Sequence, residues 1–177
     1  GRWHRIGPLR DQPPLLNWME NVASSFGHVF EAERDFHTNG GTPLLEKTYP
    51  APNFPATPDA SCRWMVHPEW IDGYLCDLPR GPAPSAGETQ YVYRRITAKR
   101  PVVVEMDFAV RSPESDRRQD DPNMEHWRRQ ARYACWLNGK QLLRYDGKDP
   151  IPGTMKLELN AGVNHFLAKV TNNRHAY

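Results

Sequence analysis

Aromatic residues that stand beside hydrogen-bonding side chains are the part of this sequence best suited to chemistry. Trp70 is followed by Asp72 and Tyr74, and Asp72-Gly73 is a turn signal. An aromatic ring stacks on the apolar face of a sugar, while carboxylate and hydroxyl groups hydrogen-bond the sugar hydroxyls. We therefore predict ligand contact by Trp70, Asp72 and Tyr74. The alternative is that Trp70 anchors its loop to the core.

A second candidate site is the run His126-Trp127-Arg128, within a charged insertion at about 112–130. An arginine fork matches a carboxylate through two parallel hydrogen bonds. An aromatic residue between a histidine and an arginine is therefore suited to an acidic sugar. The alternative is a tryptophan that pins a long loop onto the fold.

Catalytic motifs are missing from the sequence, which has no Gly-x-Ser-x-Gly, His-Glu-x-x-His or Gly-rich phosphate loop. Carboxylates gather at Glu31, Glu33 and Asp35 and at Asp120-Asp121, but no pattern places either group in an apolar pocket that would separate their pKa values. We predict a protein that is not itself an enzyme and needs no cofactor. Glu31, Glu33 and Asp35 could hold a structural Ca²⁺, and a solvated helix end is the alternative.

The three cysteines, Cys62, Cys76 and Cys135, are isolated and show no zinc-binding spacing. Cys62 and Cys76 flank a segment that can fold back on itself, which makes them the pair expected if a disulfide forms. Buried free thiols are the alternative.

Length and composition limit the remaining classes. The chain of 177 residues fits one domain with a core of its own. Its net charge of +2 lacks the one-sided basic field of a nucleic-acid binder, and no apolar run approaches the roughly 18 residues of a membrane span. The 17 prolines and 12 glycines cluster between apolar segments, as is typical of short strands joined by loops.

Alternating apolar and polar residues predict the elements that position these side chains. Asn138-Gly139 predicts a two-residue hairpin turn, and Asn160-Ala161-Gly162 a second turn before an apolar strand. Helical spacing predicts one amphipathic helix from Pro13 to Phe30, with a break near Ser24-Ser25 or Gly27. Five prolines predict that residues 42–61 cross the surface without entering a sheet interior. Strands are expected at 2–9, 62–66, 74–78, 89–98, 102–110, 131–137, 140–145, 154–160 and 164–172. This pattern favours an all-β fold, a two-sheet antiparallel β-sandwich with one short N-terminal helix.

Several of these pieces together resemble the jelly-roll, galactose-binding-like β-sandwich accessory modules of bacterial polysaccharide-degrading enzymes. They are the opening Trp3-x-x-Ile6-Gly7-Pro8-Leu9, the strand Tyr91-Val92-Tyr93, the hairpin Trp136-Leu137-Asn138-Gly139-Lys140 and the closing segment Leu159 to Asn172. The charged insertion departs from the tight turn usual in such modules. The resemblance implies a secreted, periplasmic or cell-surface setting. It also implies that residues 1–177 are a single domain of a larger chain.

Three functional hypotheses follow from the residues and the resemblance. The first is a non-catalytic carbohydrate-binding module, whose partners are a polysaccharide or oligosaccharide and the other domains of the parent chain. The second is a structural or protein-interaction domain that packs on a catalytic neighbour. The third is a part of a glycosidase or polysaccharide lyase active site shared with another domain.

Overall fold

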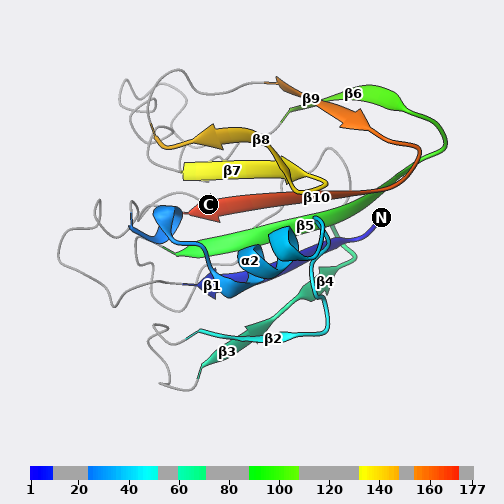
Figure 1. The fold of residues 1–177 in the computed structure, drawn as a ribbon. Helices are drawn as coiled ribbons and strands as arrows, with labels where there is room; N and C mark the ends of the chain where they lie inside the picture. Colours follow the sequence, from blue (N-terminus) through cyan, green and yellow to red (C-terminus); the bar gives the residue numbers. More distant parts are fainter. Residues whose placement is uncertain (10–23, 52–59, 71–87, 108–131, 148–153, 172–177) are drawn as a thin grey trace.

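The described part of the chain is mostly antiparallel β-structure, which confirms the all-β prediction in its general form. A computed structural model describes residues 1–9, 24–51, 60–70, 88–107, 132–147 and 154–171 (Figure 1). The helix α2 spans Glu31–Thr38. The strands are β1 (Trp3–Leu9), β2 (Thr48–Pro50), β3 (Ser61–Arg63), β4 (Met65–His67), β5 (Thr89–Ala98), β6 (Val102–Asp107), β7 (Arg132–Leu137), β8 (Lys140–Tyr145), β9 (Thr154–Leu159) and β10 (Gly162–Thr171).

One large sheet organises the fold. It has the strand order β4-β1-β5-β10-β7-β8, and its two longest strands, β5 and β10, lie at its centre (Figure 1). Two small sheets, β2-β3 and β6-β9, complete the described β-structure. No helix within the described ranges is long and apolar enough to cross a membrane.

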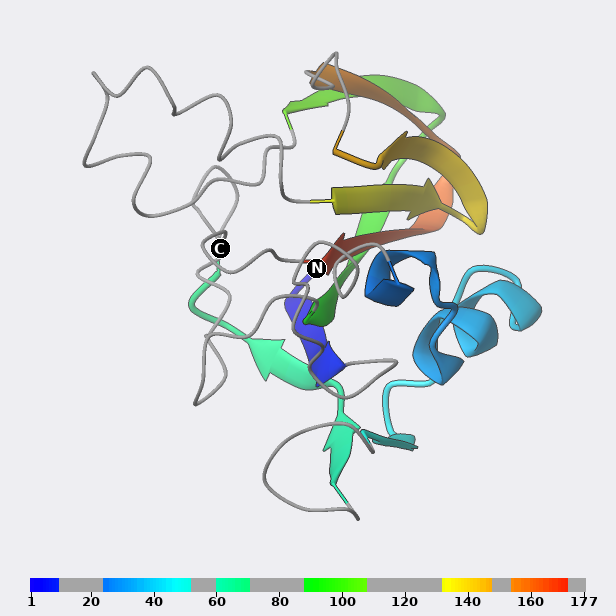
Figure 2. The same ribbon diagram turned by 90° about the vertical axis from the view of Figure 1, so that its left-hand side faces the viewer.

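The large sheet is buried on both faces, because alternate side chains of its central strands point to opposite sides. Tyr91 and Tyr93 lie in one core, and Val92 and Ile96 lie on the other side, as expected for an alternating strand over 89–98. The helix-side core joins the sheet to α2, β2 and the segment around Trp64, and Figure 2 shows α2 to one side of the sheet. Its members include Ile6, Phe26, Phe30, Phe36, Tyr49, Trp64, Tyr91, Tyr93, Trp136 and Leu167.

The opposite core is closed by the β6-β9 sheet, which gives the fold a sandwich-like character. In β9 the predicted alternation is confirmed, since Met155, Leu157 and Leu159 are buried and the residues between them are exposed. In β6, Val104 and Met106 pack inward, but Val102 at the start of the strand is largely exposed. The rest of the predicted 102–110 strand lies outside the described residues.

The Asn138-Gly139 turn is confirmed, because these two residues adopt φ values of 51° and 80° between β7 and β8. The second predicted turn also exists, but it does not close a hairpin. It carries the chain from β9, which pairs with β6, into β10, which pairs with β5 and β7. Both turns combine an asparagine with a glycine, with positive φ at Asn138 and Gly139 in the first and at Gly162 in the second. These residue types do not distinguish a hairpin from a crossover.

The buried Asn164 ties these two turns together. Its Oδ1 accepts hydrogen bonds from Asn138 Nδ2 at 3.0 Å and from Asn160 N at 2.9 Å, and its Nδ2 donates to Asn160 O at 2.9 Å. Asn138 Oδ1 in turn accepts a hydrogen bond from His165 N at 2.8 Å. The asparagines of the two turn motifs therefore have a structural role.

For the helix predicted from Pro13 to Phe30, the break expected near Gly27 is confirmed, but the end at Phe30 is wrong. Residues 10–23 lie outside the described part, residues 24–27 form a helical turn, and α2 begins only at Glu31. Phe30 has extended backbone angles, φ −67° and ψ 157°, because its side chain turns into the helix-side core. Val29, which the helical spacing places on the apolar stripe, is 45% exposed.

Two predictions over 42–66 also need correction. The proline-rich crossing contributes a strand, β2, because Tyr49 is drawn into the helix-side core and its neighbours pair with β3. The single strand expected over 62–66 is interrupted at the buried Trp64, which separates β3 from β4. Cys62 and Cys135 are free thiols, in agreement with the alternative to a disulfide. Cys76 lies outside the described residues.

Candidate functional site

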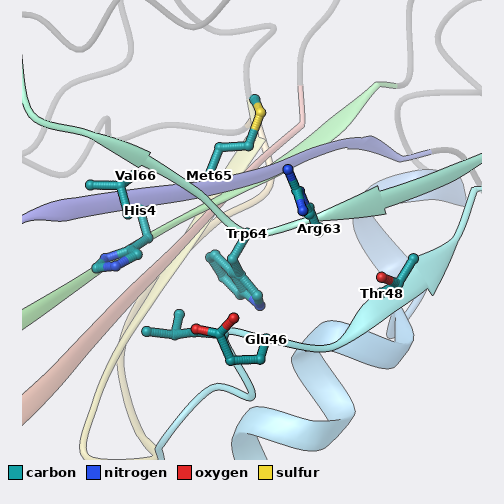
Figure 3. Close-up of a pocket in the computed structure, with 8 residues that line it drawn as sticks. His4, Glu46, Thr48, Arg63, Trp64, Met65 and Val66 are labelled. Atoms are coloured by element: carbon teal, nitrogen blue, oxygen red, sulfur yellow. The ribbon is translucent and has the colours of Figure 1, made fainter.

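A pocket of about 420 Å³ opens where the edge of the large sheet meets the small β2-β3 sheet. Its volume lies within the range of small-molecule sites. Figure 3 shows side chains from several segments around it. The lining residues are His4, Leu45, Glu46, Thr48, Arg63, Trp64, Met65 and Val66.

The break in the chain at Trp64 shapes this pocket. Before the break, β3 pairs with β2, and after it β4 pairs with β1, so that Val66 lies opposite His4. Trp64 itself is 6% exposed and meets Tyr93 edge to face, with ring centroids 6.1 Å apart. Its indole therefore supports the pocket floor and does not offer a free stacking face.

Charged groups of both signs reach the pocket from exposed positions. Arg63 and Glu46 are exposed, and neither forms an ion pair among the residues that the structure describes. Thr48 adds a hydroxyl group, while Leu45, Met65 and Val66 supply apolar surface. Hydrogen-bond donors, acceptors and apolar contacts thus meet in one space, as in binding sites for small polar ligands.

Helix α2 holds the wall of the pocket. Lys47, next to Glu46, donates to Asp35 Oδ2 and pairs with Glu31 Oε1, both at 2.7 Å. These hydrogen bonds raise the pKa of Lys47. Burial first, and then the hydrogen bond to Asp35, raise the pKa of Tyr49 to about 12. The wall segment is therefore fixed to the exposed face of α2.

Three ring side chains lie side by side on the sheet next to the pocket. Tyr93 Oη lies 2.8 Å from His165 Nδ1, and Thr42 Oγ1 lies 3.3 Å from His165 Nε2. His4 meets Tyr93 with ring centroids 5.7 Å apart. Burial, and then the positive charge of Arg95, lower the pKa of His165. Burial is also the main cause of the lowered pKa of His4.

These histidines are expected to weaken the fold in mild acid. A histidine whose pKa is lower in the folded than in the unfolded protein contributes stability above its unfolded pKa of about 6.5, and this is lost as pH falls through the folded value. We expect the free energy of unfolding, measured in urea, to be smaller at about pH 5.5 than at about pH 7.5. His165→Gln should flatten this dependence. If the free energy of unfolding of this variant changed with pH as steeply as that of the wild type, His165 would not be a source of the pH dependence.

The first sequence-predicted site is only partly described. Trp70 stacks on His67, with ring centroids 4.1 Å apart and planes 15° apart, and packs against a small core of Val92, Tyr133, Tyr145 and Val170. His67 Nδ1 also bonds Glu69 Oε1 at 2.7 Å. These contacts are those of a loop anchor. Asp72 and Tyr74, like His126, Trp127 and Arg128, lie outside the described residues, and ligand contact at all of them stays a prediction.

The three carboxylates considered for calcium lie on one helix but do not converge. Glu31 and Asp35 face Lys47, whereas Glu33 is buried against Lys169 and Tyr91. Within the described ranges, no group of three or more His, Cys, Asp or Glu side chains is arranged to hold a metal ion. Each carboxylate is instead held by a lysine.

Sequence reasoning did not single out the pocket residues. Arg63 and Trp64 were assigned to a continuous strand, and no motif marks Glu46 or His4. The burial of Trp64 between exposed neighbours, which marks the break, is known only from the structure.

No family model, curated protein or solved structure matches this chain. In the described part of the chain, the fold and the pocket therefore define the class of protein only as an antiparallel, sandwich-like β-protein with an open pocket at a sheet edge.

Proposed function

We propose that this chain is a non-catalytic β-sandwich module of jelly-roll type that binds a segment of an oligosaccharide or polysaccharide in the pocket lined by Glu46, Arg63 and Trp64. The observation that carries the proposal is the pocket of about 420 Å³, in which exposed polar groups adjoin apolar side chains. The proposed setting is a secreted, periplasmic or cell-surface enzyme in which another domain performs catalysis.

A sugar needs both polar and apolar surface in its binding site. Their hydroxyl groups donate and accept hydrogen bonds, which suits the carboxylate of Glu46, the guanidinium of Arg63 and the hydroxyl of Thr48. Their C–H faces suit Met65 and Val66, which are 42% and 45% exposed. Because Arg63 and Glu46 have no ion pair among the described residues, binding would not have to break one.

A binding role fits the pocket better than catalysis by this chain alone. Glycoside hydrolysis generally uses two carboxylates across the scissile bond. Among the described residues that line the pocket, Glu46 is the sole carboxylate. A shared active site would need the second group from another domain, and activity in a longer chain that fails in its Glu46→Gln variant would reveal it.

Removing the polar groups of the pocket is expected to weaken glycan binding. Glu46→Gln and Arg63→Gln should each lower the affinity for the bound oligosaccharide about tenfold, which corresponds to about 1.4 kcal/mol. The measurement is calorimetric titration with an oligosaccharide identified on a glycan array. Glu158→Gln is the matched control, because Glu158 is exposed on β9 and does not line the pocket.

The proposal fails if no neutral or acidic glycan binds the folded chain. Equal affinities of the two pocket variants and the control would place the binding site elsewhere, with Trp70 the next residue to replace. Circular dichroism of each variant separates a lost contact from a lost fold.

A second candidate function is docking on a catalytic neighbour. Met65 and Val66 are 42% and 45% exposed, and both line the pocket. Exposed apolar side chains that gather at one place mark interaction sites. Self-association in light scattering together with binding of an apolar dye, in the absence of glycan binding, would favour this candidate over the first.

A further inference from the structure

Two arginines and a histidine form a row across the large sheet beside the pocket. The antiparallel register of β1 and β5 begins with Trp3 opposite Arg94, and its continuation by one residue places Arg2, just before β1, beside Arg95. Arg95 in turn pairs with His165 on β10. Arg2, Arg95 and His165, here called the basic row, therefore follow one another from the start of β1 across β5 to β10.

The basic row continues into the pocket on the same face of the sheet. His4 lies two residues beyond Arg2 and Tyr93 two residues before Arg95, so both belong to the next row on that face. His4 also pairs with Val66 of β4, and both residues line the pocket. One step of two residues along a strand is about 7 Å. The basic row and the pocket are therefore adjacent.

The charges of the two arginines are not compensated by protein groups in the described part of the chain. Arg2 and Arg95 are exposed, and neither forms an ion pair with a residue that the structure describes. Like charges directly opposite each other on paired strands are destabilising. The charge of Arg95 also reaches the neighbouring rings. After burial, it lowers the pKa of His165, and it contributes to the lowered pKa of His4. The row is therefore suited to an anion.

We infer that the pocket and the basic row together bind an acidic glycan, with one sugar unit in the pocket and a carboxylate or sulfate of a neighbouring unit on Arg2 and Arg95. This inference rests on the proposed function and names its ligand class. A guanidinium fork matches the planar oxygens of such groups through two hydrogen bonds. Arg63, which lines the pocket together with His4, offers a third guanidinium (Figure 3).

Nucleic acid is the less suitable anion. The net charge of the chain is only +2, and the pocket next to the basic row contains the carboxylate of Glu46, which would repel a continuous phosphate backbone. A glycan with charges on some units and hydroxyl groups on the others fits a surface on which guanidinium groups lie near one carboxylate and the hydroxyl group of Thr48.

The inference is tested with the full chain and three polymers, which are polygalacturonate, dextran sulfate and neutral dextran. We expect binding to at least one acidic polymer, and weaker binding as the salt concentration rises from roughly 0.05 to 0.5 M. The double variant Arg2→Gln/Arg95→Gln should lose about tenfold in affinity for that polymer, because two exposed charge contacts are removed. Arg100→Gln should stay within about twofold of the wild type, because Arg100 is exposed outside the row.

The outcomes distinguish a failure of the acidic-glycan inference from a failure of the proposed glycan-binding function. Binding to polygalacturonate identifies carboxylate as the recognised group, and binding to dextran sulfate identifies sulfate. Binding to neutral dextran with equal affinity, unchanged in the double variant, would overturn the acidic-glycan inference and leave the proposed function standing. Absence of binding to every glycan would overturn both. Equally tight binding of a single-stranded DNA oligonucleotide would show non-specific anion binding and also overturn the inference.

Discussion

Lys169→Met is expected to lower the free energy of unfolding by about 3–5 kcal/mol, because it leaves a buried carboxylate without its cation. Lys169 is 1% exposed and Glu33 6% exposed, and their Nζ and Oε2 atoms lie 2.9 Å apart. Tyr91 donates a hydrogen bond of 2.5 Å to the same carboxylate oxygen, and Lys169 donates another to His28 O. The ammonium group also lies 5.6–5.8 Å from the ring centroids of Phe26, Phe30 and Tyr91.

The measurement is equilibrium unfolding in urea, with Lys140→Met as the matched control. Lys140 is exposed at the start of β8, so its replacement should change the free energy of unfolding by less than about 0.5 kcal/mol. The double variant Glu33→Leu/Lys169→Met should recover much of the loss, because replacement of a whole buried ion pair by apolar groups is often close to neutral. Equal losses for Lys169→Met and Lys140→Met would contradict the buried pair.

The ion pair of Lys169 and Glu33 also supports the pocket, because it holds α2 on the sheet. Glu33 fixes one face of α2 to the sheet, while Glu31 and Asp35 on its other face hold Lys47, next to the pocket residue Glu46. Loss of the buried pair should therefore loosen the pocket wall as well as the fold. Faster amide hydrogen exchange at residues 44–49 in Lys169→Met would report this loosening.

Asn164→Ala is expected to lower the free energy of unfolding by about 2–4 kcal/mol, because it removes the hydrogen bonds that join the two turns. Asn164 is fully buried, and its amide satisfies Asn160 N, Asn160 O and Asn138 Nδ2. Without that amide, the backbone groups of Asn160 lose their partner at the crossover from β9 to β10. Urea unfolding measures the effect.

Asn160→Ala is the matched control, because the side chain of Asn160 is exposed and its backbone makes the hydrogen bonds. A change below about 0.5 kcal/mol is expected for this control. If both variants lost a similar free energy of unfolding, the turn would need an asparagine at both positions. The buried amide of Asn164 would then have no special role.

Local patterns predicted the strands well. The bounds of β5, β7, β8, β9 and β10 agree with the predicted strands to within one or two residues. The Asn138-Gly139 turn was predicted because its positive φ angles require particular residues whatever the rest of the fold does. The helix over 13–30 was predicted from spacing alone, and its end was wrong because Phe30 is held extended by contacts with distant strands.

The candidate site was much less predictable. Of the residues proposed from sequence, only Trp70 lies in the described part, and there it stacks on His67. The pocket depends on the interruption at Trp64, which brings β1, the β3-β4 segment and residues 45–48 together. No local sequence pattern predicts that these three segments lie together.

The sequence by itself determined the class of fold, through alternation along the strands and the chemistry of two turns, because both signals act over a few neighbouring residues. Only the tertiary structure decided that β9 and β10 belong to different sheets. It alone placed Lys169 against Glu33, 136 positions away, and Arg2 beside Arg95. Buried charge pairs, rows of charges and pockets arise from the packing of distant segments, and such contacts leave no periodicity in the sequence.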